Sequence, residues 1–204
     1  MIIRRLAMPL LTVALVTISS GCGTTTHPVA GDGPLPSPVE EVQGRWWTWA
    51  SSEPEKTNPV ADPTGRFCDR NQPDDVWFLA GTFGGTVTRT CAVPAGRPIV
   101  VPLVNLVGDR VSCASFMASA EGSAVLDGNA VTPERLESDG VSVTGVEGNP
   151  LTGTSGSQDY HACGLWVRLP PLAPGEHTLV LRGASEDFTT GVDYTLAVTA
   201  APRA

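Results

Sequence analysis

Residues 76–93 read VWFLAGTFGGTVTRTCAV, and this stretch decides the fold class. Val76–Ala80 is a compact apolar run, and Thr86–Val93 alternates and is rich in β-branched residues, a pattern typical of strands. The glycines 84 and 85 between the two segments favour a tight turn, because glycine adopts backbone conformations that other residues avoid. The sequence therefore predicts a β-hairpin here.

Short strands are also predicted through the rest of the chain. Pro102 lies within one of them and indicates an edge strand or a bulge, and Asp127–Gly128 predicts a hairpin turn. No helix alternates with these strands, so the fold class expected is all-β, an antiparallel β-sandwich of the jelly-roll or Ig-like kind. The further predicted strands span 99–106, 124–131, 141–144, 165–169, 176–183 and 192–199.

One short helix is expected before the strands. Ser37 and Glu40 have the spacing of a capping box, and Pro38 suits the first helical position. Apolar residues then recur at helical spacing over about twelve residues, which predicts one buried face. The residues of that face are Val42, Trp46, Trp49 and Ala50.

The first 21 residues have the three parts of a secretory signal. Arg4 and Arg5 precede an apolar run over 6–18, and small residues follow. The run is too short to span a bilayer. Cys22 comes next, and this start resembles the lipobox of bacterial lipoprotein precursors, in which the signal is cut before a cysteine that carries lipid. Ser19 stands where those precursors usually have Leu or Val, and the alternative is an ordinary secreted protein cut nearby.

These features divide the chain into three parts. Residues 1–21 are the expected signal peptide, 22–37 the lipidated cysteine with a flexible tether rich in Gly, Pro and Thr, and 38–204 a single β-sandwich domain. The expected location is extracytoplasmic, with the lipid anchor holding the protein to the outer face of the cell membrane. A fully secreted protein is the alternative.

The five cysteines agree with export. Lipid on Cys22 would account for the odd one, and the other four can form two disulfides in an oxidising compartment. Three connectivities are possible. We prefer Cys68–Cys91 with Cys113–Cys163, because the predicted strands place Cys68 and Cys91 at opposite ends of one hairpin. A zinc site would need closer cysteine pairs than the sequence has.

Charge and motifs narrow the classes of function. The formal net charge is −8, so no basic surplus exists to bind nucleic acid. The sequence holds no P-loop, dinucleotide-binding or HExxH motif, and we expect no cofactor and no metal.

Three residues are candidates for ligand binding. Of the clustered tryptophans, Trp47 points away from the predicted apolar face and is the best candidate for exposure. Asp159 and His161 are two apart and would share one face of a strand. No nucleophile or third ligand can be placed beside them, so no catalytic residue is assigned.

Four segments resemble a group of uncharacterised bacterial secreted proteins. They are WWTWA at 46–50, VWFLAG at 76–81, TVTRTCAVPAG at 86–96 and LPPLAPGEHTLVLRG at 169–183. The resemblance implies an exported, mostly β domain, and it implies no activity.

The function expected from these features is a lipid-anchored binding or interaction module of the cell envelope, with a cell-wall glycan or an envelope protein as partner. One alternative is a hydrolase of envelope polymers that uses paired carboxylates. Another is a structural envelope protein without a ligand. The carboxylates considered for the hydrolase are Asp75, Asp159, Glu176 and Asp187.

Overall fold

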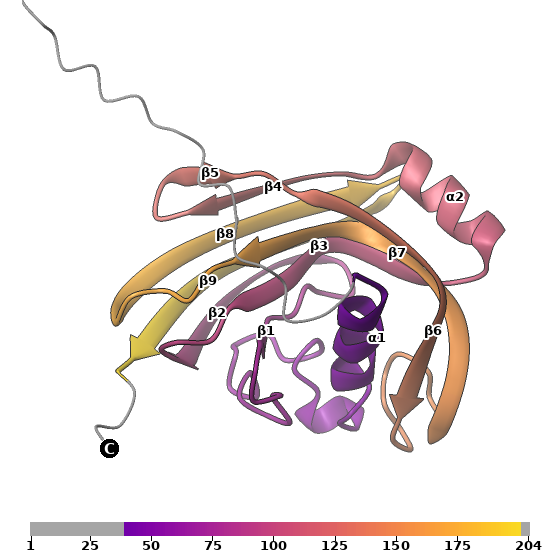
Figure 1. Ribbon diagram of the computed structural model, residues 1–204, viewed down its shortest axis with the longest axis horizontal. Helices are drawn as coiled ribbons and strands as arrows, with labels where there is room; N and C mark the ends of the chain where they lie inside the picture. The colour runs from indigo at the N-terminus through magenta and orange to yellow at the C-terminus, as the bar shows by residue number, and fades with distance from the viewer. Residues whose placement is uncertain (1–38, 201–204) are drawn as a thin grey trace, which may run out of the picture.

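The computed structural model describes residues 39–200, which form two β-sheets, two α-helices and a short 3-10 helix (Figure 1). The helices are α1 (Val39–Ala50), η1 (Glu55–Thr57) and α2 (Arg110–Ser119). The strands are β1 (Trp77–Phe78), β2 (Gly85–Pro94), β3 (Ile99–Gly108), β4 (Glu121–Leu126), β5 (Asn129–Val131), β6 (Glu134–Gly145), β7 (Gly156–Leu169), β8 (Gly175–Ser185) and β9 (Phe188–Thr199).

The two sheets pack face to face as a mostly-β sandwich, which confirms the predicted fold class. One sheet has the strand order β1-β3-β7-β6, and the other has the order β2-β9-β8-β4-β5. Alternate residues of the strands meet between the sheets; on β3 these are Ile99, Val101 and Leu103. The predicted signal, Cys22, the tether and the capping residues Ser37 and Pro38 lie outside the described residues.

Helix α1 covers the outer face of the four-stranded sheet. Strands β6 and β7 curve around it (Figure 1). Trp46 of α1 packs edge-on against Trp166 of β7, with ring centroids 5.5 Å apart. Val100 of β3 faces the core that lies between α1 and this sheet. β3 is therefore buried on both sides, which explains why its sequence is an almost continuous apolar run. The apolar face predicted for the helix is buried as expected.

The predicted hairpin over 76–93 is wrong in its pairing. β1 pairs in parallel with β3, at Trp77 and Ile99, while β2 pairs in parallel with β9 along its whole length. The two segments therefore belong to different sheets, and each sheet is mixed rather than purely antiparallel as predicted. Strand character depends on local residues, but the choice of partner depends on burial by distant segments.

Two local predictions are confirmed. The pairing of β3 with β7 shifts register between Pro102 and Val104, so Pro102 marks a bulge. β4 and β5 form a hairpin in which Asp127 and Gly128 have φ of 49° and 80°. Two successive positive φ values suit the twist of the flanking strands.

Helix α2 was not predicted. Asp109 caps it by accepting a hydrogen bond from the backbone N–H of Ser112 at 2.8 Å. Cys113 of α2 is joined to Cys163 of β7 by a disulfide, which holds the helix against β7 and the neighbouring β3.

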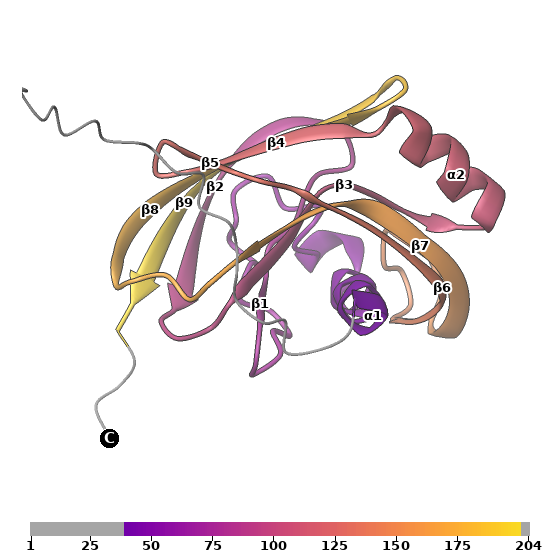
Figure 2. The same ribbon diagram turned by 45° about the horizontal axis from the view of Figure 1, so that its top comes forward.

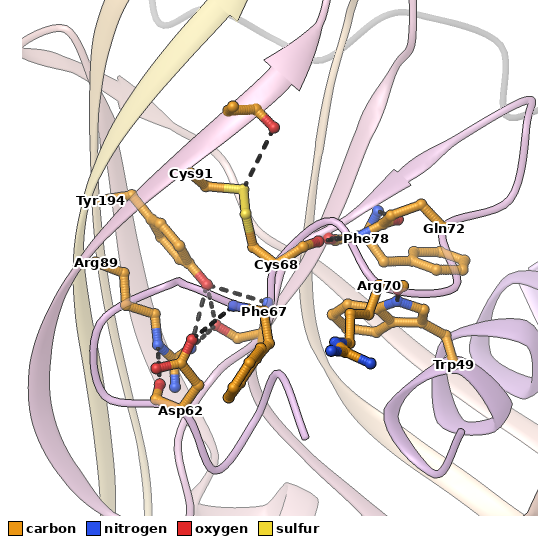
Figure 3. The surroundings of a disulfide bond; sticks show 12 residues. Trp49, Asp62, Phe67, Cys68, Arg70, Gln72, Phe78, Arg89, Cys91 and Tyr194 are labelled. Carbon is orange, nitrogen blue, oxygen red and sulfur yellow. Dashed lines mark hydrogen bonds between the residues drawn. A yellow bond between two sulfur atoms is a disulfide. The ribbon is translucent and has the colours of Figure 1, made fainter. Parts of the chain in front are cut away.

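The segment 51–76 is largely irregular, and buried polar groups hold it in place. The Cys68–Cys91 disulfide joins it to β2 (Figure 3). Arg89 of β2 is buried and donates to the carbonyl oxygens of Asp62 at 2.7 Å and Val60 at 2.9 Å. These bonds give hydrogen-bond partners both to the buried guanidinium and to the backbone carbonyl groups of the segment.

Asp62 anchors the same segment through its carboxylate. It accepts hydrogen bonds from the backbone N–H groups of Thr64 and Phe67, both at 2.9 Å. Although burial raises the pKa of Asp62, these bonds, the Thr64 hydroxyl and the charge of Arg89 together hold that pKa below its usual range.

Both predicted disulfides, Cys68–Cys91 and Cys113–Cys163, are confirmed. Two disulfides in one small domain indicate an oxidising, extracytoplasmic environment. Among residues 39–200, no helix is long and apolar enough to cross a membrane.

Candidate functional site

A small cavity of about 80 Å³ lies where α1, β3 and three loops meet. Trp47 of α1 and Asn105 of β3 line it from the inside, and Leu151 lines it from the β6–β7 connection. Phe83 and Phe188, at the starts of β2 and β9, complete its outer wall. The site thus joins segments that are far apart in the sequence.

Two residues that line this cavity each carry a buried hydrogen-bond donor without a partner. The donors are Nε1 of Trp47 and Nδ2 of Asn105. Leaving a buried donor unsatisfied costs about 1–3 kcal/mol, so such groups are rare in folded proteins.

The indole N–H groups of the two neighbouring tryptophans of α1 are both hydrogen-bonded. Trp46 Nε1 donates to the carbonyl oxygen of Leu79 at 2.9 Å, and Trp49 Nε1 donates to that of Arg70 at 2.8 Å. Trp46 also packs edge-on against Trp47 with centroids 5.0 Å apart, which fixes the orientation of the Trp47 ring.

Trp77 and Trp166 also lack a partner for Nε1, but neither lines the cavity. Trp47 is therefore the one tryptophan among the described residues that both lines the cavity and has an Nε1 without a partner.

The expectation that Trp47 is exposed is wrong, since only 7% of its surface is accessible. The prediction assumed that α1 is covered on one face only. Val60, from the segment 51–76, packs in the same core as Trp47. Trp47 nevertheless lines a candidate binding site, from inside the cavity.

Two exposed aromatic rings mark the mouth of the cavity. Phe83 is 52% exposed and Phe188 is 38% exposed, although both line the cavity. Their backbones are held together by Thr82 and Thr190, whose hydroxyl oxygens are 3.0 Å apart. The β8–β9 turn that carries Phe188 lies beside α2 (Figure 2).

The loop before β2 needs glycine to present Phe83. Gly84 and Gly85 have φ of 119° and 72°, which side-chain-bearing residues rarely adopt. A Cβ added at Gly84 would lie 3.7 Å from the Phe188 ring, so the two rings sit close to this turn.

Asp159 and His161 lie away from this cavity. Both are on β7, but Nδ1 of His161 is 2.5 Å from Oδ1 of Asp139, and Asp159 is exposed opposite Ser142. The hydrogen bond from Arg110 lowers the pKa of Asp139, and the charges of Arg110 and His161 add to this effect. The expected Asp159–His161 pair is thus replaced by a surface ion-pair group around Asp139.

The four carboxylates considered for hydrolysis are dispersed. Asp75 is paired with Arg45, Asp159 lies on β7, Glu176 begins β8, and Asp187 lies in the β8–β9 turn. None of the four main hollows among the described residues is lined by two of these four carboxylates. The four residues therefore do not meet as an acid–base pair in any of those hollows.

A larger and more open groove of about 560 Å³ runs along α1, between Trp49 and the bulge of β6 at Gly140. The polar side chains near it are paired with protein groups: Arg45 bonds to Asp75, and Asn71 bonds to Ser52. Among the described residues that line this groove, none has a buried donor or acceptor without a partner. The smaller cavity is therefore the better candidate site.

Sequence reasoning missed Asn105, Phe83 and Phe188. Asn105 is the polar residue inside the apolar strand at 99–108, and such an exception was a usable signal. The two phenylalanines carry no signal of their own, because their meeting depends on the β2–β9 pairing.

No protein-family model matches the chain, and no curated protein matches it. Among solved structures, the chain is similar to one described as the structure of PbICP-C in complex with falcipain-2. The two share 9% identity and a TM-score of 0.26, over 63% of this chain and 95% of that chain. A likeness at this level supports no conclusion about function.

Proposed function

We propose that this protein is an exported, lipid-anchored envelope protein whose sandwich domain binds a cell-wall glycan at the mouth of the cavity. The two disulfides support export, because such bonds persist in oxidising compartments. The anchor at Cys22 rests on the sequence of the first 22 residues alone.

The observation that carries the binding role is that two exposed aromatic rings line the same cavity. Isolated exposed apolar residues are ordinary on protein surfaces. Here Phe83 and Phe188 stand together at an opening. Apolar walls with a few polar groups are the usual composition of ligand sites, and aromatic rings offer flat surfaces for the C–H faces of sugars.

A glycan also fits the charge of the site. None of the described residues that line the cavity is ionisable. The ligand therefore needs to be polar but neutral at the point of contact, as sugar rings are.

Glycan binding can be tested with an array of cell-wall oligosaccharides and the disulfide-bonded domain. We expect binding to at least one neutral oligosaccharide, with at least tenfold weaker affinity in Phe83→Ala and Phe188→Ala. Val111→Ala is the matched control, since Val111 is 79% exposed and does not line the cavity. Absence of binding, or equal loss in all three variants, would contradict the proposal.

A further inference from the structure

We infer that the glycan site continues from the cavity mouth into a neighbouring groove, and that this groove binds a sugar with a protonated amino group. The glycan recognised is then one that carries amino sugars without their N-acetyl groups. This inference rests on the proposed function, because the glycan must lie against Phe188 for its next sugar to enter the groove. It goes further by naming the charge that separates one glycan from another.

The groove lies between α2 and the β8–β9 turn and is continuous with the cavity. Its volume is about 580 Å³, which is within the range of small-molecule sites. α2 contributes Phe116 to its lining, and the turn contributes Asp187. Asn105 and Phe188 line both the cavity and the groove. A glycan that lies against Phe188 at the mouth can therefore extend into the groove.

The side chains that face the ligand are accessible to solvent. Glu186 and Asp187 of the turn are exposed, and so is Ser115 of α2. The Phe188 ring is 38% exposed, and Phe116 is partly buried against α2 and β3. The groove thus presents two carboxylates beside two aromatic rings at its surface, and a ligand reaches the carboxylates without any rearrangement.

Hydrogen bonds hold the turn in place on α2 (Figure 2). Ser185 Oγ donates to the carbonyl oxygen of Phe116 at 2.7 Å, and the backbone N–H of Glu186 donates to Ser119 Oγ at 3.1 Å. The Ser115 hydroxyl donates to Oε1 of Glu186 at 3.2 Å. Both walls of the groove are therefore fixed before a ligand arrives, which lowers the entropy cost of binding.

The charge of the groove selects a cation. Among the four main hollows of the described residues, this is the one that is lined by carboxylates and by no basic side chain. The larger groove along α1 also holds Arg45, and the hollow on the five-stranded sheet also holds Arg182. Glu186 and Asp187 have no cationic partner among the described residues. They attract a ligand that brings positive charge, and they repel an anion.

A glycan of amino sugars meets both requirements of the combined site. The cavity mouth at Phe83 and Phe188 has no ionisable lining residue, and it accepts the neutral face of a sugar ring. The next sugar brings its ammonium group to the carboxylates of the groove. An ammonium has three donors and a carboxylate only accepts, so the two groups are complementary. An N-acetylated sugar carries no charge there, and an acidic sugar is repelled.

The test compares two tetrasaccharides with the same backbone and linkage. One is chitotetraose, which is N-acetylated and neutral, and the other is its fully de-N-acetylated form, which is cationic at mildly acidic pH. Calorimetric titration of the disulfide-bonded domain at that pH should show that the cationic form binds about threefold tighter or more. Added salt should reduce the difference, because salt screens exposed charges.

Variants of the turn assign the preference to the groove. Glu186→Gln and Asp187→Asn each remove one charge and keep the size of the side chain, so each should reduce the preference. The double variant should bind the two tetrasaccharides within about twofold of each other. Asp159→Asn is the matched control, because it removes an exposed carboxylate that does not line the groove, and it should keep the preference. Phe188→Ala should weaken the binding of both tetrasaccharides.

Thermal unfolding separates binding from folding. Glu186, Asp187 and Asp159 are all exposed, so the thermal midpoints of their variants should stay close to that of the parent protein. A lost preference at an unchanged midpoint then reports the groove alone.

Three results would overturn the inference. Equal affinity of the parent protein for both tetrasaccharides would remove the amino-sugar preference while leaving glycan binding in place. An equal reduction of the preference in Asp159→Asn would assign it to the net charge of −8 rather than to the groove. Failure of both tetrasaccharides and of every glycan on the array to bind would remove the proposed function as well.

Discussion

The guanidinium of Arg89 donates a hydrogen bond to the hydroxyl of Tyr194 at 3.1 Å, and that hydroxyl donates to the carbonyl oxygen of Ala80 at 2.9 Å. The Tyr194 hydroxyl also accepts from the backbone N–H of Ala80 at 3.2 Å. Through these bonds, Arg89 of β2 and Tyr194 of β9 fix the position of the segment between β1 and Phe83. Phe83 in turn forms one wall of the candidate site.

Tyr194→Phe should lower the free energy of unfolding by about 1–3 kcal/mol, because the N–H of Ala80 would stay buried without a partner. Urea unfolding of the disulfide-bonded domain measures this. Tyr160→Phe is the control, since its hydroxyl bonds to Gln158 at an exposed site, and its effect should stay within about 0.5 kcal/mol. Equal effects of the two variants would contradict the assignment.

Arg89→Met should be more damaging, with a loss of about 3 kcal/mol or more. It leaves the carbonyl oxygens of Val60 and Asp62 without their donor inside the core. Arg182→Met removes an exposed arginine that pairs with Asp193, and it should cost at most about 1 kcal/mol. Urea unfolding of both variants gives the comparison, and a loss below 1 kcal/mol for Arg89→Met would count against a buried anchoring role.

The two disulfides should stabilise different parts of the domain. A chain-entropy estimate gives about 3.5 kcal/mol for Cys68–Cys91 and about 4 kcal/mol for Cys113–Cys163, whose sequence separations are 23 and 50. Removing the first by double Ser replacement should expose the segment 51–76 to proteolysis. Removing the second should expose α2.

Limited proteolysis with mass spectrometry identifies the cleavage sites in each disulfide variant. If both variants are cut first at the same place, the disulfides do not act locally as described. Alkylation of the native parent protein should modify none of the four cysteines, because all four are in disulfides.

The Asp127–His177 pair should make stability depend on pH. The hydrogen bond to Asp127, at 2.6 Å from Nδ1, raises the pKa of His177, and the bond of Nε2 to the Ala173 carbonyl adds to this. Partial burial raises the pKa of Asp127, but the hydrogen bonds from His177 and Thr178 lower it by more. The pKa of Asp127 therefore lies below its usual range.

The signs of these shifts set the pH range. The contribution of His177 is complete below its unfolded pKa, about 6.5, and is lost as pH rises through the higher folded value. That of Asp127 is complete above its unfolded pKa, about 3.9, and is lost as pH falls through the lower folded value. The stability difference between the parent and His177→Gln should therefore be larger at about pH 5.5 than at about pH 8.5. An equal difference in urea unfolding at both values would contradict it.

Local features were the most predictable part of this fold. Three predicted features depend only on neighbouring residues, and all three are confirmed. They are the buried apolar face of α1, the hairpin turn at Asp127–Gly128 and the bulge at Pro102. The pairing Cys68–Cys91 is also confirmed, although the hairpin that motivated it does not exist. Cys91 lies on β2 and Cys68 in the segment that packs beside it.

Long-range features were not predictable from the same patterns. The partners of β1 and β2 depend on how the whole chain folds. The apolar residues of α2 show only a weak helical spacing, and the helix is short and is held in place by a disulfide. The burial of Trp47 depends on segments far from it in the sequence. The candidate site combines these non-local features, so of its residues only Trp47 was identified in advance.

The most direct test of the central claim is a two-dimensional ¹⁵N NMR titration of the disulfide-bonded domain with a neutral cell-wall oligosaccharide that binds on the array. The backbone amide signals of Phe83 and Phe188, which line the cavity, should move with saturation, and that of the exposed Val111 on α2 should move little. If the signals of Phe83 and Phe188 stay fixed at saturating oligosaccharide, the cavity is not the binding site.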